Sequence, residues 1–365
     1  MLSYKTKNIL GLLLIFVPSA GFIFSHSFLL SNAFFTVSLV IGILCESMLY
    51  RIFSLPLWLS FNISFFAFSA LTITYFPDNA AAYISYVLLG FCSGGLIFIL
   101  PPNIIIGWFF YDKARTMGYV TSIGILLSLL SSFLFNTAPA LFIIISFISM
   151  VFSSLIIIQS PPHITVDIFL DGTRHNKKNR IKLSAFFFLI SLSLTFAYII
   201  GYDSVSFIFN FSAVSAKSSV NGILTVLSMA AGPVVSSMFI NKKGIYAGSV
   251  LLIFLSELSV MCAGFYSSRT FMSYIGCVAF GAAASSSMVI CPLSVYYMMG
   301  CSSYNKNLGV ISSFMPLGAA FLLLYNNSGS EEFLSSQSVI SVLFILAVSF
   351  FTIFSAWKHR LVLLK

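Results

Sequence analysis

Residue types that perform catalysis are few in this chain and lie far apart. The four histidines, at positions 26, 163, 175 and 359, are widely separated, and neither a Gly-x-Ser-x-Gly nor a His-Glu-x-x-His motif occurs. The six cysteines form no Cys-x-x-Cys pair and no cluster with a histidine. A catalytic site needs a nucleophile beside a base, or a bound metal. The sequence therefore predicts that the protein is not an enzyme, that it has no metal site and that it needs no cofactor.

Ionisable groups inside apolar segments are the next candidates for function. Burying such a group in lipid costs several kcal/mol, so its presence usually serves a purpose. Asp203 could bind a proton or a cationic group, or it could be a solvated loop acid. Glu257 could take part in coupling, or it could be protonated or paired with another helix. Both alternatives stay open at this point.

The composition is that of a protein dissolved in lipid. Hydrophobic residues make up 59% of the 365 residues and charged residues only 7%, whereas a soluble domain is about a quarter charged. A bilayer core of about 30 Å needs roughly 20 apolar residues per helix. The net charge of +9 comes from short loops between apolar segments, so we expect no nucleic-acid partner.

The apolar segments predict an all-α membrane protein with about twelve transmembrane helices. An N-terminal six-helix bundle occupies residues 1–158, a cytoplasmic linker 159–182, and a C-terminal six-helix bundle 183–365. The basic run of the linker, 174–180, could contact anionic lipid or could be a solvated stretch that fixes topology. The predicted spans are 8–26, 28–49, 54–76, 81–107, 116–136, 138–158, 183–203, 216–240, 244–266, 271–299, 308–326 and 336–357.

The distribution of basic residues predicts the orientation. If both termini are cytoplasmic, sixteen of the eighteen lysines and arginines lie on the cytoplasmic side, and only Lys217 and Arg269 face outward. This is the positive-inside pattern, and a wrong number of spans would scramble it. We expect an integral, multi-pass protein of a plasma or inner membrane.

The two halves overlay at an offset of 191 residues. The matched pairs are Gly90 with Gly281, Pro101 with Pro292, Arg115 with Lys306, Gly118 with Gly309, and Asn136 with Asn327. Two parallel repeats of six spans are a known transporter plan, in which substrate binds near the midplane between the halves. The sequence therefore predicts two six-helix pseudo-repeats.

The segment 107–118 carries the most specific motif, Gly-Trp-Phe-Phe-Tyr-Asp-Lys-Ala-Arg-Thr-Met-Gly, with Ser-Ile-Gly following at 122–124. It is similar to the junction of the fourth and fifth spans in the oxalate/formate antiporter and monocarboxylate transporter branch of the major facilitator superfamily. The whole chain resembles that superfamily in its twelve spans, central loop and two repeats. The bases that bind dicarboxylates in that branch have no counterpart near the midplane here.

The resemblance implies a cytoplasmic gate. Gly42 and Glu46 keep the spacing of the superfamily's glycine-acid motif, and Arg51 supplies one basic group. We assign a gating role to these three residues and to Asp112 and Arg115. Glu46 could pair with a base or cap a helix N-terminus, or it could be an acid at the wet edge of the bilayer.

The resemblance also implies that the first, fourth, seventh and tenth spans line the transport path. The glycines and prolines of the fourth and tenth spans could flank the site or could serve packing alone. The path is mostly uncharged. The candidate substrate-binding residues are Ser93, Asn103, Thr195, Tyr198, Tyr202, Asp203, Ser285, Ser286 and Tyr296.

These expectations together describe a secondary active transporter or facilitator for a small organic solute, with a monocarboxylate as the first candidate. Two alternatives remain: an exporter of neutral or amphipathic compounds, and a non-transporting membrane sensor on the same fold. The expected partners are the small-molecule substrate and membrane lipid, with a proton as the candidate coupling ion. We expect a monomer.

Overall fold

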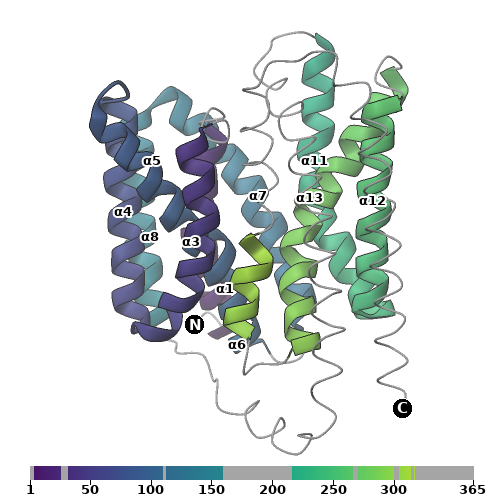
Figure 1. The fold of residues 1–365 in the computed structure, drawn as a ribbon, viewed down its shortest axis with the longest axis horizontal. Helices are drawn as coiled ribbons and strands as arrows, with labels where there is room; N and C mark the ends of the chain where they lie inside the picture. Colours follow the sequence, from purple (N-terminus) through teal and green to yellow (C-terminus); the bar gives the residue numbers. More distant parts are fainter. Residues whose placement is uncertain are drawn as a thin grey trace, which may run out of the picture.

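The computed structural model describes residues 4–25, 32–109, 112–158, 216–265, 270–299, 304–313 and 316, and these are almost entirely helical (Figure 1). Eight of the described helices are long and apolar enough to cross a membrane. They correspond to predicted spans 1 to 6, 8 and 10, so the prediction of a multi-pass all-α membrane protein is confirmed. The linker 159–182 and the spans 183–203 and 336–357 lie outside the described residues, and the domain boundaries there stay predictions.

The described helices form two groups that lie side by side (Figure 1). We call α1 to α8 the N-terminal half, and α11 to α13 with the helical segment 304–313 the C-terminal half. Helix α7 packs against α11 between them. The N-terminal half contains α1 (Tyr4–Ser25), α3 (Ala33–Ile52), α4 (Leu55–Tyr75), α5 (Ala80–Ser93), η1 (Gly94–Ile99), α6 (Leu100–Trp108), α7 (Lys113–Thr137) and α8 (Pro139–Ile158). The C-terminal half contains α11 (Ala216–Lys243), α12 (Ile245–Phe265) and α13 (Thr270–Met299).

Polar and special residues set the ends of the helices. The Asn32 side chain accepts hydrogen bonds from the backbone N–H of Phe34 at 2.9 Å and of Phe35 at 3.3 Å, which satisfies two donors at the start of α3. The Asn79 side chain accepts one such bond, from the Ala81 N–H at 3.4 Å, at the start of α5. Gly244 separates α11 from α12 with a φ of 86°, a conformation that favours glycine. The helix boundaries therefore follow from local chemistry that the sequence displays.

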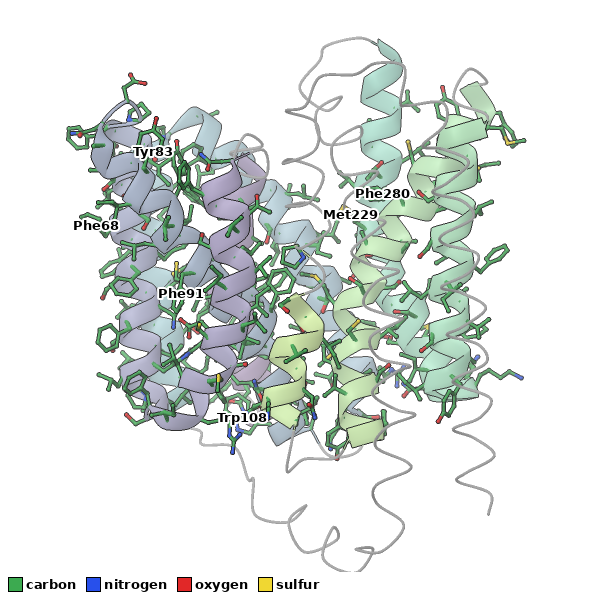
Figure 2. The ribbon with its side chains drawn as sticks, viewed as in Figure 1. Phe68, Tyr83, Phe91, Trp108, Met229 and Phe280 are labelled. Carbon is green, nitrogen blue, oxygen red and sulfur yellow. The ribbon has the colours of Figure 1, made fainter. Side chains whose placement is uncertain are left out.

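Aromatic side chains fill the core of the N-terminal half and also cover its outside. Phe22 of α1 contacts Phe66 of α4 and Phe135 of α7, with ring centroids 5.7 and 5.5 Å apart. By contrast, Phe68 and Tyr83 lie on the outer surface (Figure 2), where more than half of each side chain is exposed. Exposed apolar residues of this kind suit a surface that contacts lipid.

The fourth span is not a continuous α-helix. It consists of α5, the π-helical turn η1 and α6, and the Leu100 N–H bonds to the Gly95 carbonyl five residues earlier. Pro101 and Pro102 lack the N–H groups that would bond to the preceding turn, so the helix cannot keep its α pattern there. Such π-bulges occur often at functional sites. The tenth span, α13, remains one helix despite Pro292.

The repeat predicted from the sequence recurs in the contacts that hold each half together. A Cβ atom added at Gly90 of α5 would collide with the Phe35 carbonyl and the Ser38 hydroxyl of α3. A Cβ added at Gly281 of α13 would collide with the equivalent groups of α11, the Thr225 carbonyl and the Ser228 hydroxyl. Gly42 against α5 and Gly232 against α13 form a second matched pair. Two pseudo-repeats are therefore confirmed at the level of individual residues.

The repeat extends to the contact between the halves. A Cβ at Gly118 of α7 would lie 2.6 Å from the Pro233 carbonyl and 2.5 Å from the Ser237 Cβ of α11. A Cβ at Gly309 would lie 3.2 Å from the Ile43 carbonyl and 2.5 Å from the Ser47 Cβ of α3. Each half thus offers one glycine to a serine of the other half.

We expect Gly90→Ala and Gly281→Ala to destabilise the protein to a similar extent, by about 1–3 kcal/mol, because each new methyl group meets a backbone carbonyl that cannot move aside. The apparent melting temperature of the purified protein in detergent measures this. Gly11→Ala is the matched control, since its methyl group would meet only Ile156 and Ile157 side chains, at 3.2 Å or more. Equal melting temperatures for all three variants would contradict the packing described here.

Candidate functional site

A lysine and a tyrosine from opposite halves meet at the end of the bundle that carries Arg51, Lys242 and Lys243, which we call the basic end. The Lys113 ammonium lies 3.8 Å from the centroid of the Tyr296 ring and donates a hydrogen bond to the Tyr296 hydroxyl. Lys113 begins α7, and only 5% of it is exposed. We call this contact the Lys113–Tyr296 clamp.

The clamp is a strong contact for its kind. A cation over an aromatic ring is worth about 0.5–1 kcal/mol when exposed, and about 2 kcal/mol or more when water is excluded. The Tyr296 ring also packs edge to face with the ring of Tyr304, with centroids 6.4 Å apart, so the segment 304–313 reaches the clamp. The clamp therefore ties the two halves together at the basic end.

Sequence reasoning selected the neighbours of Lys113 and missed Lys113 itself. Asp112 is exposed and its side chain makes no capping bond to α7. Arg115 is exposed, with its guanidinium 5.9 Å from the Tyr119 ring, and Arg51 is exposed in the last turn of α3. The repeat could have distinguished Lys113 from its neighbour. At the offset of 191 residues Arg115 matches another base, whereas Lys113 matches Tyr304 and is therefore a base in one half only. The gating roles of Asp112, Arg115 and Arg51 stay predictions.

Glu46 and Gly42 both face the interior of the N-terminal half. Glu46 is 2% exposed, and its carboxyl accepts a hydrogen bond from Asn62 Nδ2 of α4 at 3.3 Å. This differs from the three alternatives drawn from the sequence, since Asn62 is neither a base nor a helix terminus and a carboxyl that is 2% exposed is not solvated. A Cβ at Gly42 would lie 2.6 Å from the Phe91 Cα, so Gly42 allows α3 to approach α5. Their gating role is untested.

The candidate substrate-binding residues fall into four groups. Ser93 and Ser286 are buried, and neither hydroxyl has a hydrogen-bond partner among the described residues. Asn103 bonds back to the Ile99 carbonyl of its own span at 2.8 Å. Ser285 bonds to the Gly281 carbonyl at 2.9 Å and lies against Gly232 of α11. Tyr296 belongs to the clamp, and Thr195, Tyr198, Tyr202 and Asp203 lie outside the described residues.

A small apolar cavity with a volume of about 20 Å³ lies among α1, η1, α6 and α7 of the N-terminal half and is closed on one side by Met288 of α13. Three of its helices belong to spans that were expected to line the path, the first, fourth and tenth, and the other is α7. The described cavity wall contains one hydroxyl, that of Thr121, and none of the predicted binding side chains. Its lining residues are Phe16, Ile97, Pro101, Pro102, Ile105, Met117, Val120, Thr121 and Met288.

Known proteins resemble this chain in structure and not in sequence. By sequence, the chain matches no family model and no curated protein. By structure, it is similar to the human organic anion transporter MFSD10, with a TM-score of 0.68 and 13% identity. It is also similar to a bacterial homologue of the iron transporter ferroportin in the outward-facing state, with a TM-score of 0.66 and 14% identity, and to the same protein soaked with iron, at 0.65 and 12%.

Each of these likenesses covers 97% of this chain and 100% of the other. Identities this low show the fold alone. The chain has the major facilitator fold, as the sequence predicted, and the oxalate/formate and monocarboxylate branch remains a prediction.

We expect Lys113→Met and Tyr296→Leu to be strongly coupled in a double-mutant cycle, with an interaction energy of about 0.5–2 kcal/mol, because each substitution alone already removes the clamp. Unfolding equilibria in mixed detergent micelles measure it. Arg115→Met combined with Tyr296→Leu is the control and should be additive. Additive effects for Lys113 and Tyr296 would show that the clamp contributes nothing to the contact between the halves.

Proposed function

We propose that this protein is a transporter that carries a small organic solute across a membrane by alternating access. The observation that supports this best is the pair of repeat-related contacts between the halves, Gly118 with Ser237 and Gly309 with Ser47. Two equivalent contacts related by a pseudo-two-fold axis allow one half to rock against the other, and parallel repeats arranged in this way are a recurring transporter design.

The Lys113–Tyr296 clamp identifies which end of the bundle is closed in this conformation. It joins α7 to α13 across the halves at the basic end, so in this conformation the two halves are held together there. Under alternating access the clamp must break when the basic end opens. Following the positive-inside rule, we assign the basic end to the cytoplasm.

The wall of the cavity, which must widen to admit an organic solute, suits one with little charge. Both halves line it through α1, η1, α6, α7 and α13, and Thr121 contributes its one hydroxyl. An ionised solute would lose its hydration there without gaining a partner in the cavity wall described. We therefore place a neutral or amphipathic compound first. A monocarboxylate, suggested by the motif at 107–118, is the second candidate.

A ligand panel tests the substrate class. We expect neutral and amphipathic solutes to raise the apparent melting temperature of the purified protein, since a ligand at 100 times its Kd adds about 2.7 kcal/mol to the stability of the native state. Monocarboxylates, dicarboxylates, sugars, amino acids and organic cations complete the panel. A shift confined to monocarboxylates would reverse the order of the two candidates. Binding without flux in proteoliposomes would contradict transport and favour a sensor.

A variant of the cavity wall tests the site. We expect Val120→Phe to abolish the stabilisation by ligand, because Val120 lines the cavity and the larger ring fills it. Leu127→Phe on the same helix is the matched control, since Leu127 is 40% exposed on the outer surface. A ligand shift that survives in Val120→Phe, with both variants folded, would place the substrate elsewhere.

A further inference from the structure

The N-terminal half contains a carboxyl group that the proposed function does not use. Glu46 is the one acid among the described side chains that is buried, with Asp78 and Asp112 both exposed. It lies on α3 and faces α4 and η1 rather than the other half. An ionised carboxylate in such a place is costly unless a base or several donors compensate it.

The hydrogen bonds around Glu46 are incomplete. Asn62 Nδ2 donates to the Glu46 carboxyl at 3.3 Å and to the Trp58 main-chain carbonyl at 3.1 Å. Two further polar atoms of this cluster, Asn62 Oδ1 and Trp58 Nε1, are buried and have no hydrogen-bond partner among the described residues. One is an acceptor and the other is a donor. Buried polar groups usually have hydrogen-bond partners, so two buried polar atoms without one, both beside the same carboxyl, need an explanation.

A carboxyl that changes its protonation state gives each of these two atoms a partner in one of its two states. A protonated Glu46 carries an O–H group, and the Asn62 amide then provides the matching acceptor in Oδ1 as well as the donor in Nδ2. An ionised Glu46 can only accept, and the Trp58 N–H is a donor suited to that state. The cluster thus holds an acceptor for the acid form, Asn62 Oδ1, and a donor for the base form, Trp58 Nε1.

The other titratable groups around the cluster do not compete with Asn62 for the Glu46 carboxyl. Within the part of the chain that the structure describes, none of them forms a hydrogen bond or ion pair with its carboxyl, and Arg51 and Lys306 are exposed. Cys92 lies within electrostatic range. These groups are Cys45, Tyr50 and Arg51 on α3, Tyr75 on α4, Tyr83, Tyr86 and Cys92 on α5, and Tyr304 and Lys306 on 304–313; η1 carries none.

The cluster touches the irregular part of the fourth span. A Cβ at Gly95 of η1 would lie 2.8 Å from Trp58 Cζ2, 3.1 Å from Glu46 Cγ and 3.2 Å from Asn62 Oδ1. Gly95 also supplies the carbonyl of the π-type bond to Leu100. The cluster therefore packs directly against the π-helical turn that leads into the cavity-lining helix α6.

We propose that Glu46, Asn62 and Trp58 form a proton-binding site inside the N-terminal half, in which a proton from water adds to a Glu46 carboxyl oxygen and is released again. Asn62 holds the protonated form and Trp58 the ionised form. The site is independent of the identity of the solute, and it would stand even if the protein did not transport.

Infrared difference spectroscopy of the full-length protein in lipid, between acidic and alkaline buffer, tests the proposal. We expect a carbonyl band of a protonated carboxyl in acid that disappears in alkali, and we expect Glu46→Gln to remove it. Asn62→Leu keeps the carboxyl but removes its acceptor, so the band should move to the frequency of a carboxyl with weaker hydrogen bonds. Asp78→Asn and Asp112→Asn are exposed controls and should leave this band in place.

Two results would overturn the proposal. One is a Glu46→Gln spectrum identical to that of the unaltered protein, which would show that Glu46 does not change its protonation state. The other is a band that Asn62→Leu leaves at its original frequency, which would remove Asn62 from the site. Asn62→Leu keeps Glu46 in place, so this second result decides the matter even if Glu46→Gln does not fold.

Discussion

The rest of the structure depends on the close approach of helix backbones at glycine. Lipid offers helices no hydrophobic reason to associate, so packing between small residues must hold them together. Gly90 brings α5 onto α3, and Gly281 brings α13 onto α11 through the equivalent atoms. The same device, with a serine opposite each glycine, joins the halves at Gly118 and Gly309. Each half is therefore a tightly packed body, and the halves meet through contacts that resemble those within them.

The features that could take part in function lie where the two halves differ from each other. The repeat matches Lys113 to Tyr304, and only Lys113 brings a charge to the contact with Tyr296. The fourth span has a π-helical turn, whereas the tenth span stays regular. The cavity lies beside that turn, and the Glu46 carboxyl lies on its other side. A symmetric framework with one modified span can thus link a buried carboxyl, a cavity and a clamp between the halves.

The sequence predicts the framework well and the site poorly, for a physical reason. Lipid requires long apolar helices, and close packing requires glycine. Both features can be recognised from the residue types in the sequence, as at Gly90 and Gly281. The role of a serine in a membrane helix cannot: Ser285 could line a path or pack against a neighbour, and only the position of Gly232 shows that it packs. The partner of Glu46 is decided by the packing of α4 on α3, which places Asn62 beside it. The apolar cavity wall uses the same residue types as the lipid-facing surface.

The most direct test of alternating access is the distance between spin labels at the two ends of the bundle, measured in lipid on a cysteine-free background. Arg51→Cys with Lys242→Cys labels both halves at the basic end, and Asp78→Cys with Phe271→Cys labels both at the opposite end; all four positions are exposed. We predict that a ligand which binds the protein changes the two distances in opposite directions, with the distance at the basic end growing when the clamp opens. Distances that stay fixed, or that change in the same direction at both ends, would contradict it.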